Sequence, residues 1–208
     1  MPLPRFDKLA PERKRVLLDA ALAEFAEHGY QAASLNRIIG AAGVSKGAIY
    51  YWFADKADLY QTVIEDLFGE MLAAGEGGID FGALTADAFW EQFAAWSHAA
   101  VQGALARPEV RALARDAMAL YTSGERALFG RIEALGQGWM DGLVARGRVL
   151  GVIRDDLPAA LLAQLGIAID TVLDHWYVER FETYEPAAVD AMVAVYVDLF
   201  RRLWEPRV

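Results

Sequence analysis

Cysteine is absent from this 208-residue chain, and histidine occurs only three times. Without cysteine there is no disulfide framework, no thiolate zinc site and no cysteine nucleophile. The three histidines (His28, His98 and His175) are scattered, and no HExxH, P-loop or GxSxG motif is present. We therefore expect no catalytic residues, no metal site and no cofactor.

One pattern keeps an enzyme open as an alternative. His175 and Glu179 are four residues apart, as are Asp170 and Asp174, so each pair would share a helical face. Such pairs can supply two metal ligands or an acid–base pair. No third ligand is specified, and a His–Glu pair at this spacing is more often an ordinary surface pair.

Long apolar runs are also missing. No uncharged apolar segment reaches the ~18 residues that a membrane helix requires. The first 15 residues, MPLPRFDKLAPERKR, lack the apolar run of a secretory signal. With 55% hydrophobic residues the chain can still bury a sizeable core. These features predict a soluble, cytoplasmic protein without a membrane partner.

Basic charge is scarce overall, since the net charge is −9. The deficit is uneven: residues 1–60 carry eight Lys and Arg against seven Asp and Glu, whereas residues 61–208 carry twelve against twenty-two. Phosphate neutralisation is local, because salt screens charges beyond about 10 Å. An acidic body on a near-neutral N-terminal part is compatible with DNA binding but does not identify it.

The sequence SLNRIIGAAGVSKGAIYYWFADKADL, residues 34–59, predicts two short helices joined by a tight turn and the start of a third. Ser34, Ser45 and Asp55 are suited to cap the three helix N-termini. Gly43 can end the first helix in a left-handed conformation. The apolar faces would be formed by Ile38, Ile39, Ala41, Ala42, Ile49 and Phe53. This arrangement is typical of a helix-turn-helix.

These residues resemble the signature of the TetR family of bacterial transcriptional regulators. AAGVSKGAIYYWFADKADL carries the likeness, and the upstream LLDAALAEFAEHGYQAAS resembles the first helix of the family. The resemblance covers roughly residues 13–60. It implies an all-α protein of about nine helices, with a three-helix DNA-binding domain over residues 1–55 and a larger effector-binding and dimerisation domain over residues 56–208.

Residues at the start of the second helix of the motif should reach base edges in the major groove. Lys46 can donate to guanine, Ala48 can meet a thymine methyl, and Gly47 allows close backbone approach. Asn36 and Arg37 project from the preceding helix, and Arg37 is the expected additional base contact. The resemblance implies phosphate-side contacts for Ser34, Ser45, Tyr50, Trp52 and Lys56. Tyr51 would reach a base or pack beside it, while Tyr50 as a core ring and Ser45 as a mere cap remain alternatives.

Outside the motif the spacing of apolar residues predicts helices to the end of the chain. The expected helices cover about residues 12–28, 56–74, 85–106, 108–121, 123–146, 158–181 and 186–204. Gly29 would end the first, a loop would cover residues 73–84, and residues 1–12 would form a loose arm in which Arg5 and Lys8 could touch DNA. The helix from residue 158 is apolar on nearly every side, so it should face a core and a further partner.

As in similar regulators, the last two helices (157–181 and 186–204) would form a homodimer, and the C-terminal domain would hold a small-molecule effector. The candidate ligand-binding residues are Phe93, Trp96, Met118, Tyr121, Trp139, Asp170 and Asp174. We thus expect a dimeric regulator that binds a palindromic operator in double-stranded DNA and is released by an effector. A repressor is the expected kind of regulator. The alternatives are a small helical enzyme and a ligand-binding adaptor without DNA regulation.

Overall fold

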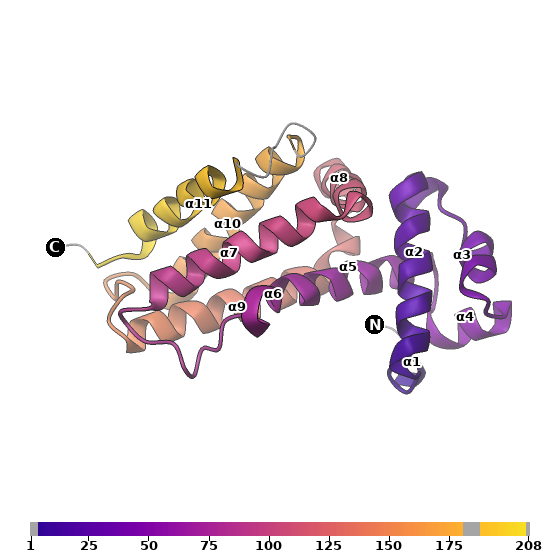
Figure 1. The fold of residues 1–208 in the computed structure, drawn as a ribbon, viewed down its shortest axis with the longest axis horizontal. Helices are drawn as coiled ribbons and strands as arrows, with labels where there is room; N and C mark the ends of the chain where they lie inside the picture. The colour runs from indigo at the N-terminus through magenta and orange to yellow at the C-terminus, as the bar shows by residue number, and fades with distance from the viewer. Residues whose placement is uncertain (1–3, 181–187, 207–208) are drawn as a thin grey trace. The chain divides into compact units, whose positions relative to one another are not determined.

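The computed structural model describes residues 4–180 and 188–206, whose regular structure is entirely helical. The helices are α1 (Pro4–Asp7), α2 (Pro11–Ala32), α3 (Leu35–Ala42), α4 (Lys46–Trp52), α5 (Lys56–Leu72), α6 (Ala74–Gly77), α7 (Phe89–Ala106), α8 (Pro108–Ser123), α9 (Gly130–Val149), α10 (Ala159–Val178) and α11 (Val189–Trp204). Two of these, α1 and α6, have only four residues, so the predicted all-α fold of about nine substantial helices is confirmed (Figure 1).

The chain divides into two compact units. The head unit comprises Met1–Gly69 and Arg107–Ile132, and the body unit comprises Glu70–Ala106 and Glu133–Val208. The head unit therefore includes α8 and most of α5 in addition to the helix-turn-helix. The predicted functional boundary after residue 55 stays a prediction, because it separates DNA binding from effector binding rather than one compact unit from another.

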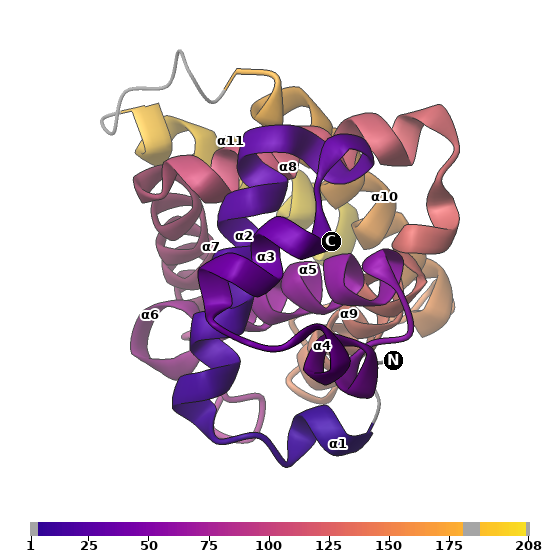
Figure 2. The same cartoon turned by 90° about the vertical axis from the view of Figure 1, so that its right-hand side faces the viewer.

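The core of the head unit is built on one face of α2. Leu17, Ala21 and Phe25 repeat at helical spacing and are fully buried. They pack with Ile38 of α3, Ile49 of α4 and several residues of α5 and α8. Burying side chains of this size is the main favourable term for the head. Figure 2 shows α3 in front of α2, with α4 below α3.

Gly29 interrupts α2 rather than ending it. The predicted helix over residues 12–28 extends to Ala32, but Gly29 has φ 68° and ψ 166°, which is outside the helical region. A Cβ at this position would lie 2.8 Å from Oδ1 of Asp116 in α8. Both the positive φ and the close carboxylate make glycine necessary at this bend.

The N-terminal segment is not the loose arm that its prolines suggested. Residues 4–7 form α1, and the side chain of Phe6 is only 5% exposed. Its ring lies 4.9 Å from that of Phe53, at the end of α4. Burial of one phenyl group contributes about 1.5–3 kcal/mol, which favours packing of α1 against the head unit.

The body unit has its own aromatic core, formed mainly by α7, α9, α10 and α11. Phe89, Phe93, Phe200 and Trp204 are fully buried there. Ile153 follows α9 and fills the space beside Gly147, where a Cβ would lie 2.4 Å from its Cδ1 atom. In the same helix a Cβ at Gly142 would lie 2.9 Å from Cε2 of Phe81, whereas a Cβ at Gly138 would meet nothing within 4 Å.

Several predicted helix limits were wrong. The expected loop over residues 73–84 contains α6, and α7 starts only at Phe89. The helix expected from residue 123 does not begin there, because Ser123 belongs to α8 and its hydroxyl donates to the carbonyl of Leu120. A 3-10 turn, Arg126–Leu128, precedes α9. The predicted limits at Phe181 and Pro186 lie outside the described residues.

Helix α10 has two apolar sides, as its sequence predicts. One side, with Leu162, Ala163 and Gly166, is buried within the body unit. The other side carries apolar residues that remain exposed in the single chain: Leu161, Leu165, Val172 and Trp176. Among the described residues, no helix combines the length and apolarity needed to cross a membrane.

Candidate nucleic-acid interface

The turn between α3 and α4 has the geometry that the sequence predicts. Gly43 adopts φ 63° and ψ 31°, the left-handed conformation that ends α3. The amides of Gly43 and Val44 donate to the carbonyls of Gly40 and Ile39. Ser45 then caps α4 by accepting a hydrogen bond from the amide of Ala48 over 3.2 Å. These local bonds fix the angle between the two helices.

Helix α4 has one buried and one exposed face. Ile49 and Phe53 are 1% exposed and join the core of the head. Tyr50 and Tyr51 are each about half exposed, so Tyr50 is not a core ring. The remaining exposed residues of α4 are Lys46 and Gly47, while Ala48 and Trp52 are half-buried. The sequence thus predicted which residues α4 presents to solvent, and their contacts with DNA stay predictions.

Ser34 occupies the N-cap position of α3, but its hydroxyl does not make the predicted capping bond. Its amide instead donates to Oε1 of Glu24 over 2.7 Å. The capping role is taken by a carboxylate from α2, which also satisfies an amide at the start of the helix. The Ser34 hydroxyl is therefore not used as a cap.

Arg37 is engaged with the same carboxylate. Its Nε lies 2.9 Å from both oxygens of Glu24, and its Nη2 donates to Oε1 over 2.5 Å and to the carbonyl of Ala32 over 3.0 Å. The Arg37 hydrogen bonds hold the pKa of Glu24 below its usual value, and Glu24 in turn raises the pKa of Arg37. The predicted base contact by Arg37 stays a prediction, but the guanidinium has a structural partner that the sequence did not reveal.

Lys56 also has protein partners. Its ammonium donates to the carbonyls of Gln31 and Ala33, over 2.9 and 3.1 Å, and lies 4.9 Å from the ring centroid of Tyr30. Lys56 therefore holds the first turn of α5 against the segment that connects α2 to α3. Its phosphate contact stays a prediction, to be tested together with this structural role.

Asp116 of α8 is a residue of the head that the sequence did not single out. Its Oδ2 accepts hydrogen bonds from the amide of Tyr30 (3.0 Å) and from the hydroxyl of Tyr60 (2.9 Å). Burial and the Asp116 charge raise the pKa of Tyr60 well above its usual value, so the phenol remains a donor. One carboxylate thus joins α8 to α5 and to the bend at the end of α2.

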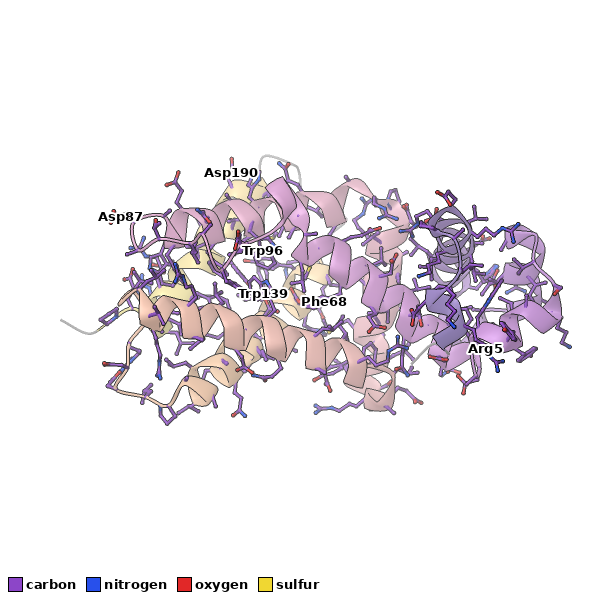
Figure 3. All side chains as sticks on the ribbon, turned by 90° about the horizontal axis from the view of Figure 1, so that it is seen from below. Arg5, Phe68, Asp87, Trp96, Trp139 and Asp190 are labelled. Carbon is purple, nitrogen blue, oxygen red and sulfur yellow. The ribbon has the colours of Figure 1, made fainter. Side chains whose placement is uncertain are left out.

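The predicted effector-binding residues do not form one group. Phe93, Trp96 and Trp139 belong to the body unit, and the rings of Trp96 and Trp139 are 4.4 Å apart (Figure 3). Met118 and Tyr121 are on α8 in the head unit, where Tyr121 contacts Phe129. The list therefore divides between the two units.

Asp170 of α10 is linked to the aromatic group through Tyr196. The Tyr196 hydroxyl donates to Asp170 over 2.7 Å, and its ring lies 5.7 Å from that of Phe93. Burial raises the pKa of Asp170. Asp174 keeps part of its surface open, but the surrounding protein and the charge of Asp170 raise its pKa as well. Of the two carboxylates, Asp170 is therefore the one that a hydrogen bond connects to the aromatic group.

A groove of about 570 Å³ lies on the body unit, lined by residues of α7 and α11 that include His98 and Asp190. None of the predicted effector-binding residues lines it. His175 pairs with Glu179 over 3.4 Å, the ordinary surface pair expected from their spacing. Within the described parts of the chain, no group of three His, Cys, Asp or Glu residues could hold a metal ion.

Comparison with known proteins supports the likeness at the head. The sequence model described as "Bacterial regulatory proteins, tetR family" matches residues 17–63. The HTH-type transcriptional regulator AcrR of Shigella flexneri is 45% identical over 56 residues, which are 27% of this chain and 26% of that protein. The match thus spans about a quarter of that relative.

Two further likenesses extend beyond the head. The HTH-type transcriptional repressor KstR2 of Rhodococcus jostii is 28% identical over 171 residues, which are 79% of each chain. The transcriptional regulator FadR of Bacillus subtilis, solved in complex with stearoyl-CoA, superposes with a TM-score of 0.65 at 20% identity. That superposition covers 88% of this chain and 97% of FadR, and it shows a common fold.

Proposed function

Because the chain belongs to the TetR family of bacterial transcriptional regulators, we propose that it represses transcription by binding a palindromic operator as a homodimer. The observation that carries this proposal is the exposed face of α4. Lys46, Gly47, Tyr50 and Tyr51 lie on a helix whose opposite face is buried. Side chains at the start of such a helix can read base edges in the major groove.

The dimer is proposed from the exposed apolar side of α10. Leu161, Leu165, Val172 and Trp176 repeat at helical spacing, and Val195 of α11 is also exposed. A row of large apolar side chains on two helices favours burial against a second copy. Two copies of α4 would then enter successive major grooves, about 34–36 Å apart.

An effector would bind in the body unit. Apolar contacts would come from the rings of Phe93, Trp96 and Trp139. Acidic groups would come from the carboxylates Asp170 and Asp174. FadR is recorded with an acyl-CoA, so acyl compounds belong in the same screen as hydrophobic cations and phenolics. An effector would release DNA only through different affinities for the two states, typically 1–3 kcal/mol of coupling.

Fluorescence anisotropy tests the proposal with a duplex taken from the DNA upstream of the gene and a random duplex of equal length. We expect specific binding at least ~10³-fold tighter than random binding. Equal affinity for both duplexes, across upstream regions and sequences selected from a random pool, would contradict it. In that case a ligand-binding adaptor without DNA regulation would be favoured. A thermal-shift screen with the three ligand classes addresses the effector.

A further inference from the structure

Arg5 of α1 lies over the ring of Tyr51 on α4. The guanidinium carbon is 4.4 Å from the ring centroid, within the range of a cation–π contact. Both side chains are exposed, and Tyr51 retains 51% of its accessible surface. A basic group from the N-terminal helix is thus placed directly beside the exposed face of α4 (Arg5 is labelled in Figure 3).

Packing of the neighbouring residue fixes this position. Phe6 is 5% exposed and contacts Phe53, which is itself 1% exposed. Lys14 of α2 adds a cation–π contact, with its ammonium 5.4 Å from the Phe6 ring centroid. Leu9 is partly buried against the same core. Arg5 is therefore attached to an anchored helix next to α4 and not to a freely moving terminus.

The contact with Tyr51 leaves the hydrogen-bond donors of Arg5 unused. A cation–π contact does not consume the N–H groups of a guanidinium, which lie in the plane of the group. Within residues 4–180 and 188–206, Arg5 has no hydrogen-bond or salt-bridge partner. The planar N–H groups match the geometry of phosphate oxygens, to which they can donate in pairs.

We propose that Arg5 and Tyr51 form one composite contact to a backbone phosphate, which extends the DNA-binding surface from α4 onto α1. The proposal rests on the proposed function. Tyr51, whose role the sequence left between base contact and packing, is assigned to support Arg5 at the phosphate. Such a contact positions the protein on the duplex without reading sequence, so it acts on operator and random DNA alike.

The test uses the full chain and measures binding to an operator duplex and a random duplex by anisotropy. The salt concentration is varied from about 50 to about 300 mM, because the salt dependence of the affinity reports the number of phosphate contacts. The variants are Arg5→Ala, Arg5→Lys, Tyr51→Leu and the Arg5→Ala/Tyr51→Leu double variant. Lys8→Ala is the matched control, since Lys8 is an exposed cation of the same segment without a ring partner among the described residues. Melting curves verify that each variant is folded.

Arg5→Ala is expected to weaken binding to both duplexes about fivefold and to reduce the slope of log K against log salt by ~0.9, the value for one phosphate. Arg5→Lys should lie between Arg5→Ala and the native chain, because it keeps the charge but loses the planar fork of N–H donors. Lys8→Ala should change affinity by less than about twofold. The double variant should be scarcely weaker than Arg5→Ala, because the two residues act as a unit.

An unchanged salt slope in Arg5→Ala, a loss equal to that of Lys8→Ala, or additive effects of Arg5→Ala and Tyr51→Leu would each overturn the proposal. The comparison of the two duplexes distinguishes a failure of this proposal from a failure of the proposed function. If the native chain bound the operator no better than random DNA, the regulator proposal would fail. The random duplex would still decide on Arg5, because a phosphate contact does not depend on sequence.

Discussion

The hydroxyl of Tyr60 donates a hydrogen bond to Asp116 over 2.9 Å, which joins α5 to α8 inside the head unit. The same carboxylate oxygen accepts the amide of Tyr30 at the bend that leads into the helix-turn-helix. The chain reaches α8 only after it has passed through α7 of the body unit. Asp116 therefore connects a late segment of the chain to the position from which α3 begins.

Removing this carboxylate should destabilise the head. Asp116→Ala leaves the Tyr30 amide and the buried Tyr60 hydroxyl without their acceptor, so we expect a loss of about 2–3 kcal/mol in the free energy of unfolding. Tyr60→Phe removes one bond and the polar group together, and should cost about 1 kcal/mol or less. Urea unfolding measures both variants. Equal stability of Asp116→Ala and the native chain would show that these bonds contribute nothing.

Lys46 and Lys56 should differ in their effects on DNA binding. Lys46→Ala should weaken operator binding by about 1–3 kcal/mol and relax preference at one base position, because Lys46 is exposed at the start of α4. Lys56→Ala should weaken operator and random DNA alike and also lower the melting temperature, since its ammonium holds two backbone carbonyls. Anisotropy on both duplexes and a melting curve separate the two. A Lys46→Ala variant with unchanged base preference would contradict the first assignment.

The Glu24–Arg37 pair predicts a pH dependence of stability. The folded-state pKa of Glu24 is lowered, so its contribution is present above the unfolded value of about 4.3 and is lost as the pH falls through the folded value. Glu24→Gln should therefore cost about 2 kcal/mol at pH 7, and the difference from the native chain should shrink below about pH 4. Glu27→Gln is the control, since that side chain is 77% exposed. A difference that stays constant with pH would exclude the ion pair as its cause.

Two glycines of the motif should respond in opposite ways to alanine. A Cβ at Gly40 would meet nothing within 4 Å, so Gly40→Ala should stabilise α3 by about 0.5–1 kcal/mol through helix propensity. Gly43 has φ 63°, and Gly43→Ala should cost about 1–2 kcal/mol because a side chain is strained in this conformation. Thermal unfolding of both variants provides the comparison. Destabilisation by Gly40→Ala would indicate that the open space at this position is needed.

The proposed dimer depends on the exposed side of α10. Val172 is 67% exposed, and Val172→Glu would place a charge at the proposed interface, so we expect dissociation to monomers at micromolar concentration. Light scattering coupled to size-exclusion chromatography measures the change in mass. Val149→Glu is the matched control, because Val149 is 77% exposed at the end of α9. Unaltered mass in Val172→Glu would place the interface elsewhere.

Local signals explain where sequence reasoning was accurate. The turn at Gly43, the Ser45 cap and the burial of Ile49 and Phe53 depend on residues within a few positions of each other. Local signals also misled the prediction of a loop over residues 73–84, because the glycines there obscured the four-residue α6. The ring groups of the body were also only partly predictable: periodicity indicated that Phe93 and Trp139 are buried or half-buried, but not which other rings they meet.

The sequence by itself determined the helix-turn-helix, because caps, a positive-φ glycine and apolar spacing act over short separations. Only the tertiary structure decided which partners complete it. Asp116 lies 86 residues from Tyr30, Arg37 pairs with a carboxylate of another helix, and Phe6 anchors α1 by packing under α4. Such contacts depend on how helices are placed in space, and no local pattern encodes that placement. The residues that α4 exposes for the proposed DNA contact can be identified from the motif, whereas those that hold α4 in position come from the fold.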